Sequence, residues 1–167
     1  MADLASEVVL RDLGIGDAGW LIQKHAELYA RDEGFDQSFE ALVARVLADF
    51  IDNHDPTCER AWIAWAGDRR IGSIFCVKGS MRGLAKLRLF LLRPEARGLG
   101  LGQRLLDACL TFARDKGYQR LTLWTHESHR AACALYAKNG FDCVKSTPVR
   151  SFGVDLVEQE WTRALTV

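Results

Sequence analysis

Three glycines at alternate positions constrain the fold of this chain more than any other feature. They lie in RPEARGLGLGQRLLDACLTFA (residues 93–113), after a segment that predicts a strand over 84–94 and before a predicted helix that ends near Gly117. Such a helix start presents free backbone N–H groups and the positive end of the helix dipole, and Arg97 adds a planar guanidinium. The stretch therefore predicts an anion site. The alternative is that the glycines form only a tight turn.

Two common phosphate-binding patterns do not fit this loop. The dinucleotide pattern G-x-G-x-x-G requires glycine at 103, where the chain has Gln103. The P-loop requires lysine and a hydroxyl residue after its last glycine, but Gln103 and Arg104 follow Gly102. A nucleotide-binding Rossmann protein is therefore disfavoured.

The remaining patterns predict one domain, residues 1–167, of α/β (α+β) class, because hairpin strands come first and strands alternating with helices follow. Helices are expected at 17–31, 39–50, from the glycine loop to 117, and 129–141. Strands are expected at 7–13, at 60–79 as a hairpin, at 84–94 and 119–125, and at 141–146 and 156–167 around a turn-rich segment, 147–155.

Composition narrows the classes of partner. Lys plus Arg and Asp plus Glu number 22 each, which argues against a nucleic-acid surface or a strongly acidic partner. The N-terminus lacks a signal-peptide pattern and no segment is long and apolar enough to span a membrane, so we expect a cytoplasmic protein with no membrane partner. The five cysteines are an odd number without a C-x-x-C pair, which predicts core thiols and no metal site.

Residues shared by several segments carry a family resemblance. Arg97, Gly100 and Gly102 satisfy [QR]-x-x-G-x-[GA] after a strand, and LYAKNGF (135–141) and SFGVDLVEQEW (151–161) follow. From about residue 7 to 165 the chain resembles the GNAT superfamily of acetyl-CoA-dependent N-acetyltransferases. It is similar to the acetyltransferase domain that elsewhere is fused to MarR-type regulators, here as a free-standing version.

This resemblance implies a fold and an activity. The fold would be a mixed, mostly antiparallel sheet of about seven strands, splayed between strands 4 and 5, with about four helices. The enzyme would transfer an acetyl group from acetyl-CoA directly to a primary amine of a small molecule or peptide, in a ternary complex. A non-catalytic acetyl-CoA-binding or regulatory module is the alternative, because the glycine loop explains coenzyme binding only.

The resemblance also implies roles for individual residues. Tyr136 would protonate the leaving thiolate, although it could instead be a packing aromatic of its helix. His129 stands where many relatives have an Asn that contacts the coenzyme, and could equally be a plain helix N-terminal residue. The pantetheine arm would pair with the backbone of the central strand and the pyrophosphate would bind the loop; these residues are Phe90, Leu91 and Leu92, and Arg97, Gly98, Leu99, Gly100, Leu101 and Gly102.

The general base and the acceptor are less defined. The alternate positions of the central strand hold Lys86, Arg88 and Phe90, without a carboxylate, so the base is left open among His126, Glu127 and a water chain. Glu33 could bind an ammonium group and Arg150 a carboxylate, which would suit an amino-acid-like acceptor. In this fold the acceptor groove would be lined by Tyr29, Glu33, Phe35, Arg150, Ser151 and Phe152, and the family's split sheet suggests a possible homodimer.

Overall fold

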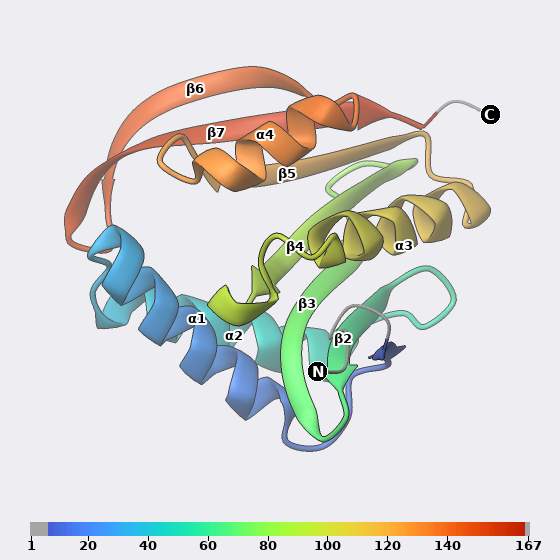
Figure 1. Ribbon diagram of the computed structural model, residues 1–167. Helices are drawn as coiled ribbons and strands as arrows, with labels where there is room; N and C mark the ends of the chain where they lie inside the picture. Colours follow the sequence, from blue (N-terminus) through green and yellow to red (C-terminus); the bar gives the residue numbers. More distant parts are fainter. Residues whose placement is uncertain (1–6, 166–167) are drawn as a thin grey trace.

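A seven-stranded sheet organises residues 7–165, the part of the chain that the computed structural model describes (Figure 1). The strand order is β1-β2-β3-β4-β5-β7-β6. The strands are β1 (Val8–Arg11), β2 (Arg60–Ala66), β3 (Arg69–Lys78), β4 (Leu84–Leu92), β5 (Arg120–His126), β6 (Asp142–Ser151) and β7 (Val154–Ala164). The helices in these residues are α1 (Asp17–Glu33), α2 (Gln37–Asn53), α3 (Leu101–Asp115) and α4 (Arg130–Lys138), with a 3-10 turn at Pro94–Ala96.

The sheet opens between its two central strands. Every neighbouring pair is antiparallel except β4 and β5, which are parallel and pair only over Leu84–Lys86 and Arg120–Thr122. Beyond these residues β4 continues to Leu92 and β5 to His126, and Figure 1 shows the two strands diverging. The mixed sheet with a splay between strands 4 and 5 is therefore confirmed.

Two apolar cores hold the helices against the sheet. Leu105, Leu106 and Cys109 of α3 belong to one core with α4 and the central strands, whereas α1 and α2 belong to the other. The buried face of α2 is narrower than its apolar spacing predicts, because Leu42 is 36% exposed. The residues of α2 that are buried are Phe39, Val43, Leu47 and Phe50, at the spacing of one helix face.

The C-terminal hairpin corrects one prediction. Segment 147–155 is turn-rich in sequence, but most of it is strand, and only Phe152 and Gly153 form the turn. Pro148 is tolerated because β6 is an edge strand with only β7 as a neighbour. The first strand is also shorter than its predicted span, and residues 166–167 of the last predicted strand lie outside the described residues.

The cysteines are only partly the core thiols that the sequence predicts. All five are free; Cys76 and Cys109 are buried, Cys58 and Cys133 are half-buried, and Cys143 is exposed on the edge strand β6. The prediction is wrong for Cys143 because all residues in the first half of β6, 142–146, are exposed to solvent. Within residues 7–165, no helix has the length and apolarity needed to cross a membrane, and no group of three or more potential ligands is arranged for a metal ion.

Gln103, the residue that breaks the dinucleotide pattern, joins α3 to α4. Its side-chain amide exchanges two hydrogen bonds with that of Asn139, at 2.7 and 2.9 Å. Asn139 also donates to the Leu135 carbonyl at 2.8 Å, at the end of α4. The first turn of α3 is thus held against the last turn of α4.

We expect Asn139→Ala to lower the free energy of unfolding by about 1.5 kcal/mol, because it removes both hydrogen bonds with the half-buried Gln103 amide, whose nitrogen then keeps only Asp107 as a partner. Urea denaturation measures this change. Asn53→Ala is the matched control, since the Asn53 amide donates only to the exposed Asp49 at 2.9 Å, and its change should stay within about 0.5 kcal/mol. Equal losses for the two variants would contradict the role of the amide pair.

Candidate active site

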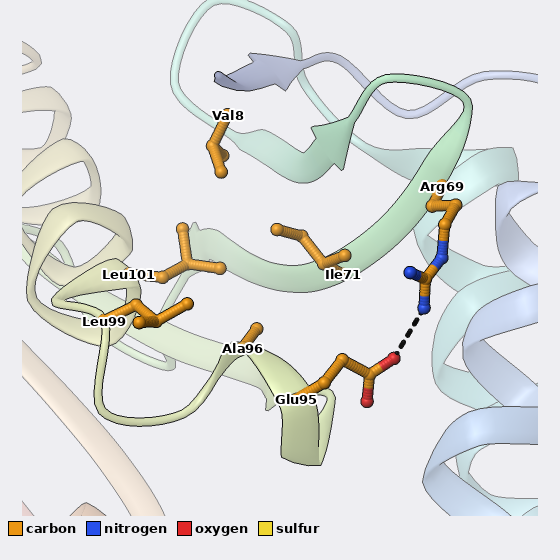
Figure 2. A pocket seen from close by; sticks show the side chains of 7 residues that line it. All are labelled: Val8, Arg69, Ile71, Glu95, Ala96, Leu99 and Leu101. Carbon is orange, nitrogen blue, oxygen red and sulfur yellow. Dashed lines mark hydrogen bonds and ion pairs between the residues drawn. The ribbon is translucent and has the colours of Figure 1, made fainter. Parts of the chain in front are cut away.

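The loop between β4 and α3 is anchored on its apolar side. Ala96 and Leu101 are buried, and together with Val8 and Ile71 they line a small apolar niche (Figure 2). An ion pair of 2.8 Å between Arg69 and Glu95 lies at its rim. Leu99 completes the lining but remains 42% exposed. The apolar side chains therefore fix one side of the loop on the sheet. They leave the backbone polar groups on its other side free of these contacts.

The three glycines of the loop serve two different purposes. Gly98 and Gly100 have φ of +78° and +79°, which favours glycine, so the tight-turn alternative accounts for them. Gly102 has no such φ, but a Cβ there would lie 3.3 Å from the Leu92 side chain and 3.5 Å from that of Leu135. Gly102 thus keeps open the space between the end of β4 and α4.

The start of α3 has the geometry of an anion site. The first bond of the helix runs from the Arg104 N–H to the Gly100 carbonyl, at 3.1 Å. The N–H groups of Leu101, Gly102 and Gln103 therefore have no intrahelical acceptor. They carry the positive end of the helix dipole.

A bulge interrupts β4 beside this loop. The register against β3 shifts between Ser73 and Phe75, and Leu89 has a φ of +48°. The buried Ser73 hydroxyl donates to the Leu89 carbonyl at 2.6 Å and so satisfies the group that the bulge turns away. On the side of β4 that faces away from β3, the segment with Phe90, Leu91 and Leu92 has no strand partner, since the pairing with β5 ends at Lys86.

Tyr136 lies in the buried part of α4 next to this unpaired segment. Its side chain is 4% exposed, and its ring centroid is 6.3 Å from that of Phe90 and 5.6 Å from that of Phe141. Burial raises the pKa of the Tyr136 phenol well above its usual value, so the hydroxyl is protonated and can donate. The ring packs as a core aromatic, and its hydroxyl group can still donate a proton or a hydrogen bond.

An aromatic cluster joins the α1–α2 turn to the β6–β7 turn. The Tyr29 ring lies 5.5 Å from Phe35, which lies 4.9 Å from Phe152. These three predicted acceptor residues are therefore together. Arg150 is not among them: its exposed guanidinium contacts Asp155 at 3.1 Å and the Gly153 carbonyl at 3.2 Å, in the hairpin whose turn follows Ser151, the last residue of β6.

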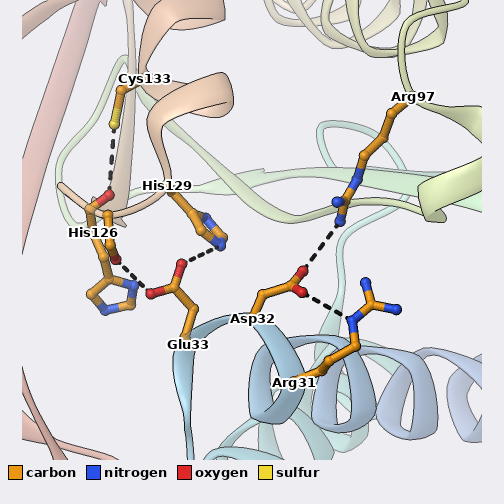
Figure 3. Close-up of polar contacts among 8 residues, drawn as sticks. Arg31, Asp32, Glu33, Arg97, His126, His129 and Cys133 are labelled. Carbon is orange, nitrogen blue, oxygen red and sulfur yellow. Dashed lines mark hydrogen bonds and ion pairs between the residues drawn. The ribbon is translucent and has the colours of Figure 1, made fainter.

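Glu33 connects the end of α1 to the turn between β5 and α4 (Figure 3). Its side chain is 9% exposed; one oxygen accepts from the Ser128 hydroxyl at 2.6 Å and the other lies 3.5 Å from His129 Nε2. Burial lowers the pKa of both His126 and His129, which keeps the imidazoles neutral at neutral pH. Glu127, another predicted candidate for the base, is exposed.

Two residues of this region were not predicted from the sequence. Asp32, next to Glu33, lies 3.6 Å from Arg97 of the glycine loop, and Ser128 binds Glu33. The sequence did contain a signal for Asp32. Two adjacent carboxylates at a helix C-terminus interact unfavourably with the helix dipole, so a positively charged partner is expected nearby. For Ser128 the sequence offered no signal, since only the fold brings it to α1.

We expect Ser73→Ala to lower the free energy of unfolding by about 1–2 kcal/mol, because the carbonyl of Leu89 loses its buried donor. Thermal or urea unfolding measures the stability. The exposed Ser38, whose hydroxyl contacts only the helix-capping Asp36, provides the control variant Ser38→Ala. An unchanged stability for Ser73→Ala would mean that the bulge does not need this hydrogen bond.

A splayed mixed sheet, with the start of α3 beside the segment of β4 that β5 leaves unpaired, is similar to the fold of acetyltransferases that use acyl-coenzyme A. The chain belongs to the acetyltransferase (GNAT) family, whose model matches residues 22–141. The spermidine N-acetyltransferase from Vibrio cholerae, solved in complex with CoA and spermine, has the same fold. Its TM-score is 0.71 at 18% identity, over 96% of each chain.

The curated relatives are similar to this chain over only a part of their own length. A mycothiol acetyltransferase from Geodermatophilus obscurus is 32% identical over 85 residues, which are 48% of this chain and 28% of the relative. N-acetyltransferase 8F1 from Rattus norvegicus is 34% identical over 84 residues, 48% of this chain and 38% of the relative. The chain thus spans well under half the length of these relatives.

Proposed function

We propose that this protein transfers the acetyl group of acetyl-CoA to a primary amine of a small molecule or peptide, directly and within a ternary complex. One observation carries the proposal: the anion-binding start of α3 adjoins the unpaired edge of β4, with Tyr136 beside that edge. The names of the matched relatives, which are acetyltransferases, support the same chemistry.

The coenzyme would use backbone groups more than side chains. The pyrophosphate would bind the free N–H groups from Gly98 to Gly102 and the Arg97 guanidinium, with Leu99 and Leu101 contributing their backbone only. The two amides of the pantetheine arm would hydrogen-bond to β4 at Phe90, Leu91 and Leu92, where β5 leaves the strand edge unpaired. His129 at the start of α4 would face the same arm.

The transfer needs three groups from the protein. A base removes a proton from the acceptor ammonium, and the neutral amine attacks the thioester carbonyl. Backbone N–H groups of β4 near the bulge at Leu89 would stabilise the oxyanion that forms. When the C–S bond breaks, Tyr136 would donate its proton to the thiolate; burial raises the pKa of the phenol, so the hydroxyl carries a proton at neutral pH.

The acceptor would approach from the side of the α1–α2 turn. Tyr29, Phe35 and Phe152 form an apolar wall there, and Glu33 supplies a buried negative charge suited to an ammonium group. Arg150, already engaged by Asp155, would contact only an acceptor that extends along the β6–β7 hairpin.

A homodimer stays a prediction, which size-exclusion chromatography with light scattering can test.

Acetyl-CoA titration by calorimetry and thiol release with a panel of amines test the proposal together. The panel contains amino acids, polyamines and peptides with free amines. We expect acetyl-CoA binding, and thiol release that depends on at least one amine. Binding of acetyl-CoA without turnover of any amine would point to a coenzyme-binding module in place of an enzyme.

We expect Gly102→Ala to weaken acetyl-CoA binding at least about tenfold, because its Cβ fills the space between Leu92 and Leu135. Stability should change by less than about 1 kcal/mol, since alanine is the better helix former and offsets the close contact. Calorimetry and urea unfolding measure the two effects. Gly19→Ala in α1, where a Cβ meets no atom within 4 Å, should leave affinity unchanged. Parallel losses of affinity and stability in Gly102→Ala would mean that the glycine is only structural.

We expect Tyr136→Phe to lower kcat by roughly 10²–10⁴-fold, because the thiolate loses its acid while the ring still packs. Steady-state kinetics with the best amine of the panel measures this. Tyr118→Phe is the control: the Tyr118 hydroxyl donates to the Cys58 carbonyl at 2.8 Å, away from the split, so only stability should change. A wild-type kcat in Tyr136→Phe would remove Tyr136 from the chemistry.

A further inference from the structure

The acceptor amine needs a base, and β4 offers none, since its residues Leu84–Leu92 include Lys86 and Arg88 but no carboxylate. We propose that Glu33 and His129 form a carboxylate–imidazole pair that removes the proton from the acceptor ammonium. This assignment rests on the proposed function. It replaces the choice that the sequence leaves open among His126, Glu127 and water.

The contacts of Glu33 fix the orientation of the pair. The carboxylate is 9% exposed; one oxygen accepts a hydrogen bond from the Ser128 hydroxyl at 2.6 Å, and the other lies within ion-pair distance of His129 Nε2, at 3.5 Å. A carboxylate beside Nε2 favours the tautomer that carries its proton there. The lone pair of His129 is then on Nδ1, which makes no capping bond although His129 occupies the N-cap position of α4. Nδ1 is therefore the basic atom.

The charges around His129 suit a base. Glu33 and Asp32 of α1 raise its pKa, Arg97 of the glycine loop lowers it, and burial lowers it further. His126 of β5 faces His129 with a ring-centroid distance of 6.4 Å. Because burial is the largest effect, the imidazole is neutral at neutral pH, while Glu33 stands ready to stabilise the imidazolium once the proton arrives.

The position of His129 connects this base to the proposed acid. The His129 ring is 4.7 Å from the ring of the half-buried Tyr29, and Tyr29 adds to the effect of burial that raises the pKa of Tyr136. The competing candidates have weaker geometry. Glu127 is exposed, and the His126 ring packs edge-on against Phe35 at 5.4 Å. Of the histidines in residues 7–165, His129 is the one within ion-pair distance of a carboxylate.

The step balances without another reactant. A proton moves from the ammonium to His129 Nδ1, and the neutral amine forms the C–N bond at the thioester carbonyl. The C–S bond breaks with its electron pair on sulfur, and Tyr136 protonates that thiolate. The proton from the new amide nitrogen and the proton on His129 pass to Tyr136 and to water. One proton is released per acetyl group transferred.

Nitrogen NMR of the histidine side chains tests the pair without a substrate. We expect His129 to carry its proton on Nε2 in the wild-type protein. In Glu33→Gln, its titration should move to lower pH, because the negative charge that favours the imidazolium is gone. Glu27→Gln is the matched control on the same helix, since Glu27 is exposed and contacts Gln23 and Lys24. A wild-type His129 protonated on Nδ1 overturns the pair, whatever the variants do.

Kinetics tests the role of the pair as a base. The probes are spermidine, benzylamine and glycyl-lysine, of which the one acetylated fastest is used. In the wild type, kcat/KM should rise with pH through the His129 titration. His129→Asn should lose that rise and about 100-fold or more in kcat, and Glu33→Gln should move it to lower pH with a lower plateau. Calorimetry of acetyl-CoA binding separates any effect on the coenzyme.

The outcomes distinguish this inference from the proposed function. A wild-type protein that binds acetyl-CoA but acetylates none of the three amines overturns the proposed function. An active wild type with unchanged pH profiles in both variants overturns only the base assignment. A lost pH dependence in His126→Asn but not in His129→Asn overturns it in favour of His126.

Discussion

The short parallel pairing between β4 and β5 is the constraint on which the rest of the structure depends. Only three residues of each strand pair, so the following part of β4 has backbone groups that no strand satisfies on that side. In most sheets such an internal edge would be costly or would recruit another chain. Here the same gap is bordered by the start of α3 and by Tyr136 of α4, and it is where we propose that an extended ligand with amides and phosphates binds.

The gap stays open because of particular side chains and hydrogen bonds. Gly102 leaves the space between Leu92 and Leu135, and the Gln103–Asn139 amide pair sets the spacing of α3 and α4. On the other side of β4, the Ser73 hydroxyl holds the bulge at Leu89. None of these contacts involves a large buried area, yet together they determine which backbone groups face the opening.

Local patterns made most of the fold and the loop predictable. The apolar spacing of α2 and the strand–glycine–helix order around 84–117 depend on neighbours in sequence, and both appear in the structure. The segment 147–155 was mispredicted because its turn-forming residues, among them Pro148, are tolerated at a sheet edge once β7 pairs with them. Strand pairing across the hairpin outweighed local turn preference.

The same difference between local patterns and distant contacts applies to the predicted site residues. The loop glycines and Tyr136 follow from motifs, whereas the partners of Glu33 depend on contacts between α1 and the β5–α4 turn, almost a hundred residues apart in sequence. No local pattern links Glu33 to Ser128. The ligand contact of Arg150 stays a prediction; in the structure its guanidinium contacts Asp155 at 3.1 Å, a partner in the same hairpin.

The end of α1 places two adjacent carboxylates on the two sides of the opening. Asp32 pairs with Arg97 on the α3 side, and Glu33 with Ser128 and His129 on the α4 side. The first pair is exposed on both partners, and such pairs contribute less than about 1 kcal/mol, so a diphosphate could take over Arg97 at little cost. Glu33 is far less exposed and has two partners. The asymmetry means that α1 can release Arg97 while Glu33 keeps its contacts with Ser128 and His129.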